Sequence, residues 1–287
     1  MPLRGRLAPT PTGLLHVGHA RTFAVAAARA GTAGLVLRIE DLDRPRCRED
    51  FCQAAIDDLR WLGLDWTEGP EVGGPRAPYR QSKRTAWYLD IWRRLEEAGA
   101  IYPSPHSRRD VDEAATAPHE PRAGAIADAE PIFPPSLRPA SWDRAATPGA
   151  VAWRFRVPDG RTIDFDDALA GRVRRTAGID FGDFVVWRRD DLPAYELAVV
   201  ADDHAMEIAE VVRGEDLLTS TSRQLLIYEA LAWTAPLFCH VPLVRDAEGH
   251  RLAKRTGGLA IRELRERGFT PADVLSAPLD QLAVTRP

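Results

Sequence analysis

The chain has 287 residues and a formal net charge of −4, with 45% hydrophobic and 28% charged residues. These values are typical of one large or two modest globular domains, and they argue against a disordered chain and against a polycation that coats nucleic acid. Three cysteines without a CxxC pattern, and the lack of an apolar signal segment or an apolar run near ~18 residues, make a secreted or membrane protein unexpected and predict a cytoplasmic location.

The N-terminal part of the sequence predicts a strand, a turn, a helix and a second strand. Residues 5–7 form a short extended run before the breaker cluster at 9–13, and residues 16–29 form an Ala-rich segment with strong helix propensity. Residues 35–39 read as a compact apolar strand that ends in an acidic run. This order indicates the beginning of a βαβ unit on a parallel sheet.

Apolar spacing further along the chain predicts more helices and a β-rich region. Helices are expected over residues 50–62, 83–98, 221–234 and 261–267. Residues 103–149 lack periodicity and predict an irregular insertion, whereas 151–194 alternate in the short runs typical of a small β-rich unit. We expect a second buried strand over 197–201 and a polar, Gly-rich loop over 246–258.

The motif His16-Val-Gly-His19 follows the first turn and opens the first predicted helix. Helix N-termini attract anions because unpaired backbone N–H groups and the helix dipole point toward the ligand. Gly18 would let a flat ligand approach the backbone, and the two histidines can donate hydrogen bonds to phosphate oxygens. On its own, the motif also fits two surface histidines or half of a metal site.

A basic loop near the other end of the chain reads Arg251-Leu-Ala-Lys-Arg255 and is followed by two glycines. Such a loop could close over a triphosphate and place a point charge on it, although most basic loops are simply solvated. Lys83 and Lys254 are the only lysines among 38 basic residues. This rarity mildly favours a need for a compact ammonium at Lys254.

In combination, these motifs resemble those of class I aminoacyl-tRNA synthetases, HVGH matching the HIGH motif and RLAKR the KMSKS loop. Four more segments resemble glutamyl-tRNA synthetases: RLAPTPTG at 6–13, LRIEDLD at 37–43, YRQS at 79–82 and VVRGEDLL at 211–218. The resemblance implies an α/β fold with a Rossmann-like doubly wound parallel sheet, an α+β insertion and a short helical C-terminal segment.

The same resemblance implies a division of the chain into four parts. The two halves of the Rossmann-like catalytic domain would occupy residues 1–100 and 195–240. An acceptor-binding-like insertion would occupy residues 101–194. The KMSKS-like loop and a helical segment would occupy residues 241–287.

A glutamate pocket is implied in which Arg6 and Arg213 read carboxylates and Glu40 accepts from the substrate's ammonium group. The residues that would complete this pocket are Tyr195, through its hydroxyl, Ala8 and Thr10. Two guanidinium groups and one carboxylate complement the two carboxylates and one ammonium of glutamate. Taken singly, each charged side chain also fits a structural ion pair.

The implied reaction is the formation of glutamyl-adenylate, which needs positioning and charge stabilisation more than a protein nucleophile. ATP binding would rest on His16, Gly18, His19 and Lys254. The histidines would hold the phosphates and the lysine would stabilise the departing pyrophosphate, with Mg²⁺ accompanying ATP. Arg251 and Ala253 stand where the KMSKS motif has lysine and serine, so loop closure is expected to be weaker or differently tuned.

Only about 30 residues follow Gly258, whereas full glutamyl-tRNA synthetases continue into a long anticodon-binding region. The chain therefore resembles the truncated paralogues, the glutamyl-Q tRNA(Asp) synthetases, which attach glutamate to queuosine at the wobble position of tRNA(Asp). This implies ATP, L-glutamate and the anticodon loop of tRNA(Asp) as partners, with no obligate protein partner and no membrane. Arginines that could form a basic surface for this RNA are Arg108, Arg109, Arg172, Arg174, Arg175, Arg188 and Arg189.

Many members of the family carry a zinc site in the insertion, and this sequence departs from its ligand pattern. Ser104, His106, Phe133 and Ser136 stand at the ligand positions. Because serine is a poor zinc ligand and phenylalanine is none, we expect no structural zinc. The insertion must then be held by packing or stay mobile, and residues 107–130 are expected to be the most disordered part.

Other functions remain open from the sequence alone. A minimal glutamyl-tRNA synthetase would charge the tRNA 3′ end, against which the missing anticodon region counts. A catalytically silent nucleotide- or RNA-binding paralogue would fit the lost zinc ligands and the altered basic loop. A more distant HxGH nucleotidyltransferase would explain the ATP site but not the glutamate pocket.

Overall fold

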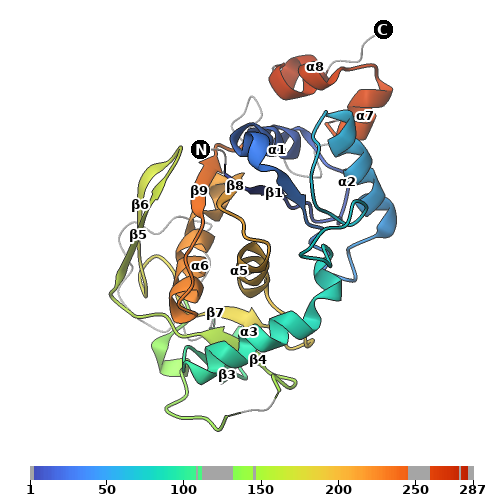
Figure 1. The fold of residues 1–287 in the computed structure, drawn as a ribbon. Helices are drawn as coiled ribbons and strands as arrows, with labels where there is room; N and C mark the ends of the chain where they lie inside the picture. The colour runs from blue at the N-terminus through green and yellow to red at the C-terminus, as the bar shows by residue number, and fades with distance from the viewer. Residues whose placement is uncertain are drawn as a thin grey trace.

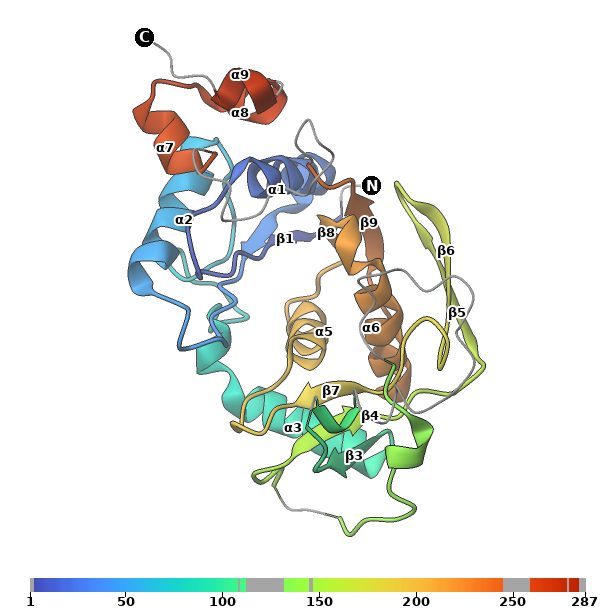
Figure 2. The ribbon, with the colours of Figure 1, turned by 180° about the vertical axis from the view of Figure 1, so that it is seen from behind.

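The computed structural model describes residues 3–107, 109–111, 132–144, 147–244, 259–277 and 279–283. Its elements form an α/β fold with parallel strand pairs and covering helices, and a β-rich part lies at the opposite end from the C-terminal helices (Figures 1 and 2). None of the described helices has the length and apolarity that a membrane span requires.

The first structural unit is strand β1 (Gly5–Leu7), helix α1 (Val17–Ala30) and strand β2 (Leu35–Leu37). The two strands pair in parallel, with Arg6 opposite Val36, which confirms the predicted βαβ beginning. Side chains that α1 buries recur every three or four residues: Val17, Ala20, Phe23, Ala26 and Ala30.

A second parallel unit lies beside the first. Strand β8 (Glu210–Gly214) and strand β9 (Leu237–Val241) pair in parallel and are joined through helix α6 (Leu218–Ala230). The N–H of Ala209 donates to the carbonyl of Arg4 over 2.8 Å, and this bond sets the start of β8 beside the start of β1. These parallel strands and crossover helices are the arrangement of a Rossmann-like fold.

The remaining predicted helices are present with small shifts. They are α2 (Glu49–Trp61), α3 (Thr85–Glu97) and α7 (Ile261–Glu266), and two further short helices are α8 (Pro271–Ser276) and α9 (Leu279–Ala283). Helix α6 ends four residues before the predicted residue 234. Ala232 beyond its end has a φ of 54°, which is incompatible with a continuing right-handed helix.

The β-rich region is confirmed. It contains a three-stranded antiparallel sheet and a hairpin that also pairs in parallel with β9. Strands β3 (Ile101–Ser104), β4 (Ala152–Phe155) and β7 (Phe184–Trp187) form an antiparallel sheet in the order β3-β4-β7. Strands β5 (Thr162–Asp167) and β6 (Gly171–Thr176) form a hairpin. Asp167, at the end of β5, pairs with Phe238 of β9, so the hairpin joins the sheet of the second parallel unit.

The described residues of the insertion are largely irregular between β3 and β4. The short 3-10 helices of the chain are η1 (Gly31–Ala33), η2 (Gln81–Lys83), η3 (Pro135–Leu137) and η4 (Glu215–Leu217). The loop predicted over 246–258 lies outside the described residues. So does most of 107–130, from which the structure describes 107 and 109–111.

The strand predicted over 197–201 is wrong, because these residues lie within helix α5 (Tyr195–Ala205). Every residue of α5 from Glu196 to Asp203 is buried. A helix that is buried on all sides shows no 3.6-residue alternation, so a short apolar run within it has the same pattern as a buried strand. Figure 1 shows α5 in the middle of the molecule, between α6 and α3.

Candidate functional site

A cavity of about 420 Å³ lies where β1, β2 and β8 end and α1 begins. Nine sequence-predicted site residues line it: Arg6, Ala8, Thr10, His16, Gly18, His19, Glu40, Tyr195 and Arg213. Ligands of open α/β sheets bind at the carboxyl ends of the strands, and the polar residues that follow these strands meet there. The structure therefore brings together all of the predicted site residues that it describes.

The two histidines of the HVGH motif cap helix α1. Nδ1 of His16 accepts from the backbone N–H of Gly18 over 3.1 Å, and Nδ1 of His19 accepts from the backbone N–H of His16 over 3.2 Å. Their ring centroids lie 3.8 Å apart. Because Nδ1 of each ring is an acceptor, the neutral imidazoles carry their proton on Nε2, where it can be donated to an anion.

Gly18 is required by this cap. A Cβ atom at Gly18 would lie 3.0 Å from Cε1 and 3.1 Å from Nδ1 of His16. Any side chain there would force the His16 ring to shift by a few tenths of an ångström. The glycine thus keeps both the helix end and the imidazole in place.

Glu40 and Arg6 belong to a buried charge cluster around Arg38, which is itself fully buried. The Arg38 guanidinium donates to Oε1 of Glu40 over 3.0 Å and to Oδ1 of Asp203 over 2.6 Å. Nε of Arg6 lies 3.5 Å from the same Asp203 oxygen, and Nη1 of Arg6 donates to the carbonyl of Val212. Burial raises the pKa of the Glu40 carboxyl, and the guanidinium groups of Arg38 and Arg6 oppose that shift.

Asp202 connects this charge cluster to η2 and α3. Its carboxylate accepts from Nε of Arg84 over 2.6 Å, from the Tyr88 hydroxyl over 2.8 Å and from the Gln81 amide over 2.9 Å. Nε of Arg38 lies 3.8 Å from it. A fully buried carboxylate needs such partners, and here they anchor the helix behind the cavity.

Arg213 is held by polar partners on each of its nitrogen atoms. Nε donates to Nε2 of His240 over 3.2 Å, Nη2 donates to the Thr221 hydroxyl over 2.6 Å, and Nη1 lies 3.5 Å from the Tyr195 hydroxyl. Arg213 is 4% exposed, while Tyr195 is 39% exposed. The partners therefore fix the plane of a guanidinium that lines the cavity.

His240 receives its own orientation from Asp167, at the junction of the β5–β6 hairpin with β9. Oδ2 of Asp167 lies 2.6 Å from Nδ1 of His240, and backbone N–H groups of Leu169 and Ala170 donate to Oδ1. Burial and the charge of Arg213 lower the pKa of His240, so the ring is neutral near pH 7. A neutral ring that donates through Nδ1 has a lone pair on Nε2 for Arg213.

Sequence reasoning missed Arg38, Asp202, Asp203, Asp167 and His240. Three of these positions carried a signal, because a charged residue within or directly after an apolar run must find a partner if the run is buried. Arg38 interrupts the apolar run over 35–39, just after β2, and Asp202 and Asp203 follow the apolar run of α5. The other two residues carried no such local signal.

The segment that contains Lys254, Arg251 and Ala253 lies outside the described residues, but both of its flanks contact the histidine cap. Val244 lines the cavity beside Gly18 on one flank. On the other flank, the N–H of Val17 donates to the carbonyl of Leu259 over 3.2 Å. The chain therefore leaves and returns next to the start of α1.

The four positions expected to lack zinc ligands are described, and three of them adjoin one another. Ser104 ends β3 and accepts from Nε of Arg154, whose guanidinium lies over the Phe133 ring at 4.2 Å. His106 packs against the same ring, with centroids 6.3 Å apart. Ser136 is exposed in η3. No group of three or more potential metal ligands occurs among the residues that the structure describes, and a phenylalanine under a guanidinium does not fit a zinc centre.

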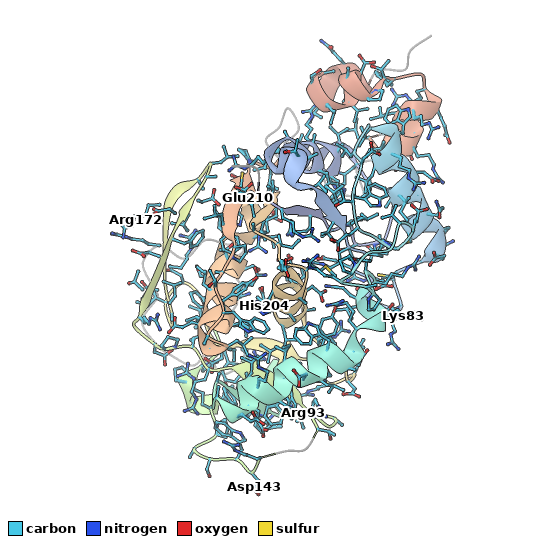
Figure 3. The ribbon with its side chains drawn as sticks, viewed as in Figure 1. Lys83, Arg93, Asp143, Arg172, His204 and Glu210 are labelled. Atoms are coloured by element: carbon cyan, nitrogen blue, oxygen red, sulfur yellow. The ribbon has the colours of Figure 1, made fainter. Side chains whose placement is uncertain are left out.

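The arginines proposed as a basic surface are partly neutralised. Arg172 pairs with Asp164 over 2.6 Å, and Arg188 pairs with Asp190 over 2.5 Å. Figure 3 shows Arg172 on the β5–β6 hairpin, on the opposite side of the molecule from Lys83. Arg108 is outside the described residues.

Comparison with known proteins decides the family. A family described as tRNA synthetases class I (E and Q), catalytic domain, matches residues 2–280. The chain belongs to this family. It is a ligase-type enzyme with the α/β fold of the class I synthetases, as the resemblance of its motifs implied.

Relatives of the class I family fall into two size groups. A glutamyl-Q tRNA(Asp) synthetase from Symbiobacterium thermophilum is 44% identical over 99% of this chain and 90% of its own length. A glutamate–tRNA ligase from Lactobacillus delbrueckii subsp. bulgaricus is 39% identical, over 94% of this chain and 55% of the ligase. The chain spans about half the length of such ligases.

A solved structure agrees with this class I assignment. A glutamate tRNA ligase from Elizabethkingia meningosepticum, in complex with its amino acid, superposes with a TM-score of 0.72. The identity is 28%, and the match covers 90% of this chain and 53% of that chain.

Proposed function

We propose that this enzyme activates L-glutamate with ATP and transfers the glutamyl group to the queuosine base at the wobble position of tRNA(Asp). The observation that carries the first half is the charge content of the 420 Å³ cavity. Its charged lining residues, besides the two histidines, are Arg6, Arg213, Glu40 and Asp216. Among them, the guanidinium groups of Arg6 and Arg213 complement the two carboxylates of glutamate, and the carboxylate of Glu40 complements its ammonium group.

In the activation step, an α-carboxylate oxygen of glutamate attacks the α-phosphorus of ATP. The bond from that phosphorus to the bridging oxygen breaks, and pyrophosphate leaves with the electron pair. His16 and His19 donate through Nε2 to phosphate oxygens at the positive end of α1. Lys254 stabilises the charge that develops on pyrophosphate, and Mg²⁺ bound together with ATP would supply further charge neutralisation.

In the transfer step, a nucleophile of the queuosine base attacks the carbonyl of glutamyl-adenylate, and AMP leaves with its phosphate oxygen. Queuosine and tRNA(Asp) are supported by similarity to shorter relatives. Three of these are named glutamyl-Q tRNA(Asp) synthetase, and the chain covers 82–90% of their length. The glutamate–tRNA ligases are nearly twice as long as the region that matches this chain.

The decisive experiment separates activation from transfer. Glutamate-dependent exchange of labelled pyrophosphate into ATP tests activation, and transfer of labelled glutamate to queuosine-containing tRNA(Asp) tests the acceptor. We expect exchange, transfer to tRNA(Asp) and no transfer to tRNA(Glu). Charging of tRNA(Glu) would identify a minimal ligase, and a lack of exchange both with and without RNA would identify a silent paralogue.

Lys254→Ala tests the assignment of the basic loop. Loss of one transition-state electrostatic contact should lower pyrophosphate exchange by about 10²–10³-fold. Arg93→Ala is the matched control, because it removes an exposed cation of α3 that does not line the glutamate cavity. An exchange rate near that of the wild type for Lys254→Ala would contradict the assignment.

A further inference from the structure

A second cavity, of about 370 Å³, shares a wall with the glutamate cavity. Pro11, Ile39 and Cys52 lie beneath it and are buried, and Arg44, Ser82 and Lys83 are among its polar lining residues. The shared wall consists of two adjoining segments: the N–H of Glu40, on the first cavity, donates to the carbonyl of Pro9 over 3.0 Å. The volume of the second cavity suits a nucleotide-sized ligand.

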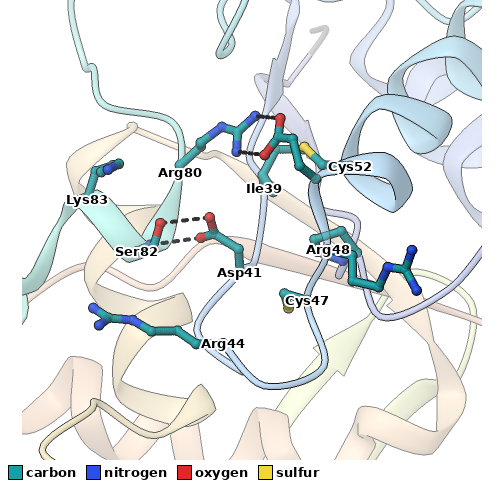
Figure 4. Close-up of a pocket in the computed structure, with 11 residues that line it drawn as sticks. Ile39, Asp41, Arg44, Cys47, Arg48, Cys52, Arg80, Ser82 and Lys83 are labelled. Carbon is teal, nitrogen blue, oxygen red and sulfur yellow. Dashed lines mark hydrogen bonds and ion pairs between the residues drawn. The ribbon is translucent and has the colours of Figure 1, made fainter.

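Most charges around this second cavity are already paired. Arg80 forms a bidentate ion pair with Glu49 at 2.7 Å, and Arg48 pairs with Asp50 at 2.8 Å (Figure 4). Asp41 accepts from both the backbone N–H and the hydroxyl of Ser82, over 2.8 and 2.7 Å. Because these pairs balance most of the charge, a cation without a carboxylate partner would set the net charge of this cavity.

Two cations are the exceptions. Within the described part of the chain, neither Lys83 nor Arg44 has a carboxylate at ion-pair distance. Figure 4 shows both on the same side of the Ser82–Asp41 pair, whereas Arg48 extends to the other side. Together they outnumber the carboxylate of Asp41, so this rim of the cavity favours an anion.

The backbone that carries Lys83 is fixed on both sides. Gln81 and Arg84 are buried and both hydrogen-bond to Asp202, and Ser82 is doubly bonded to Asp41. Lys83 alone in this run is exposed. A rigid turn that presents one solvent-facing ammonium is a preorganised phosphate contact, because little backbone entropy is lost on binding.

We propose that this second cavity binds a nucleotide of the RNA substrate next to the one that enters the glutamate cavity, with its phosphodiester against Lys83 and Arg44. This inference rests on the proposed RNA substrate. A polymer is favoured over a free nucleotide because the two cavities are separated only by the shared wall, which consecutive nucleotides can straddle.

The test is the salt dependence of RNA binding. The Kd for queuosine-containing tRNA(Asp) is measured over a series of KCl concentrations for the wild type and the double variant Lys83→Met/Arg44→Met. Each phosphate of single-stranded RNA that is no longer neutralised lowers the magnitude of the slope of log K against log salt by about 0.7, so the loss of this one phosphodiester contact should lower it by about 0.7. Lys83→Arg, which keeps the charge, should retain most of the slope.

Arg93→Met is the matched control, because Arg93 is an exposed cation on α3, away from the cavity (Figure 3). Its slope should equal that of the wild type, and thermal unfolding of each variant verifies folding. An unchanged slope for the double variant, or an equal decrease for Arg93→Met, would overturn the proposal.

Two further measurements identify the occupant and separate the two proposals. If the double variant weakens inhibition by pyrophosphate and leaves RNA binding intact, the cavity holds a free polyphosphate and the RNA assignment is wrong. If the wild type binds this RNA with the expected slopes but transfers no glutamate to it, the proposed function fails and the RNA subsite stands. If the wild type transfers glutamate and the double variant keeps the wild-type slope, the proposed function stands and the RNA subsite fails.

Discussion

At the scale of single residues, the orientation of the Arg213 guanidinium depends on residues that do not line the cavity. Its guanidinium is oriented by His240 and Thr221, and His240 is oriented by Asp167. A neutral imidazole is needed for this role, because a protonated ring would point a second N–H at a cation. We therefore regard His240 as a positioning residue rather than a catalytic one.

Replacing His240 with alanine should weaken glutamate binding. A lost hydrogen bond to a charged group costs about 1.5–3 kcal/mol, which corresponds to roughly a 10- to 100-fold rise in the KM for glutamate. The kcat of pyrophosphate exchange should change far less. His204→Ala is the matched control, because His204 stacks on Trp233 outside the cavity. A fall in kcat at constant KM would contradict the positioning role.

The lowered pKa of His240 leads to a prediction about how the free energy of unfolding depends on pH. Its pKa in the folded state lies below the ordinary value of 6.5 because of burial and the charge of Arg213. The unfolded chain therefore binds a proton at a pH where the folded chain does not, and the contribution of His240 to stability decreases as the pH falls below about 6.5. Relative to His240→Gln, the wild type should lose unfolding free energy on acidification from pH 7 to 5. Equal pH profiles in urea denaturation would refute this.

At the scale of elements, the start of α1 joins a helix cap to an anion site. Gly18→Ala places a Cβ 3.0 Å from the His16 ring and should displace it. The expected result is a raised KM for ATP, since an imidazole donor moves away from the phosphates. Ala28→Gly, at an exposed position of α1, is the control for loss of helix stability, about 1 kcal/mol. A wild-type KM for Gly18→Ala would sink the proposed role of this cap.

Helix α5 carries both aspartates of the buried charge cluster. Asp202→Ala removes the partner of Arg84 and Tyr88 and leaves Arg38 with one carboxylate fewer. Breaking a buried pair from one side costs about 3–5 kcal/mol, and urea denaturation should show this loss. Asp90→Ala, at an exposed position of α3, should change stability by less than about 0.5 kcal/mol.

Sequence reasoning predicted elements that helix propensity or apolar spacing marked, and it failed at a completely buried helix. Helix α1 was predicted from the helix propensity of its Ala-rich sequence, and β2 from its compact apolar run. Helix α5 was mistaken for a strand because its apolar run has no exposed side. Strands β8 and β9 were not predicted as strands, since five-residue runs interrupted by polar residues give no clear period.

In the candidate site, too, some residues were predictable from the sequence and others were not. Residues on recognisable motifs were predicted, and the structure gathers them in one cavity. The supports behind them, Asp167 and His240, come from separate strands, and their pairing depends on how the β5–β6 hairpin meets β9. Long-range pairing of this kind leaves no mark in local sequence.

At the scale of the whole molecule, the antiparallel sheet β3-β4-β7 packs against the helices of the Rossmann-like part in one hydrophobic core. A core cluster joins α3, β4 and β7 to α5 and α6. We propose the four-part division at residues 100, 194 and 240 as a description of chain order. Contacts between the parts are extensive, and the pairing of β5 with β9 crosses the boundary at residue 194.

The insertion should be stable without a metal. Arg154 over Phe133, with Tyr102 and Val111 nearby, packs the region where the family resemblance implied zinc-ligand positions. Treatment with a zinc chelator should therefore leave the thermal unfolding midpoint unchanged, and elemental analysis should find no stoichiometric zinc. A chelator-induced decrease in the midpoint would overturn this expectation.

The buried charge cluster constrains how this enzyme could be redirected to another amino acid. Arg6, Glu40 and Arg38 are balanced through Asp203, so no member can be exchanged alone without stranding a charge in the interior. A route to a neutral or basic side chain must therefore pass through coordinated replacements on β1, β2 and α5. The residues that determine substrate choice must therefore change together. Mutant libraries that vary one of these positions at a time should yield mostly destabilised proteins.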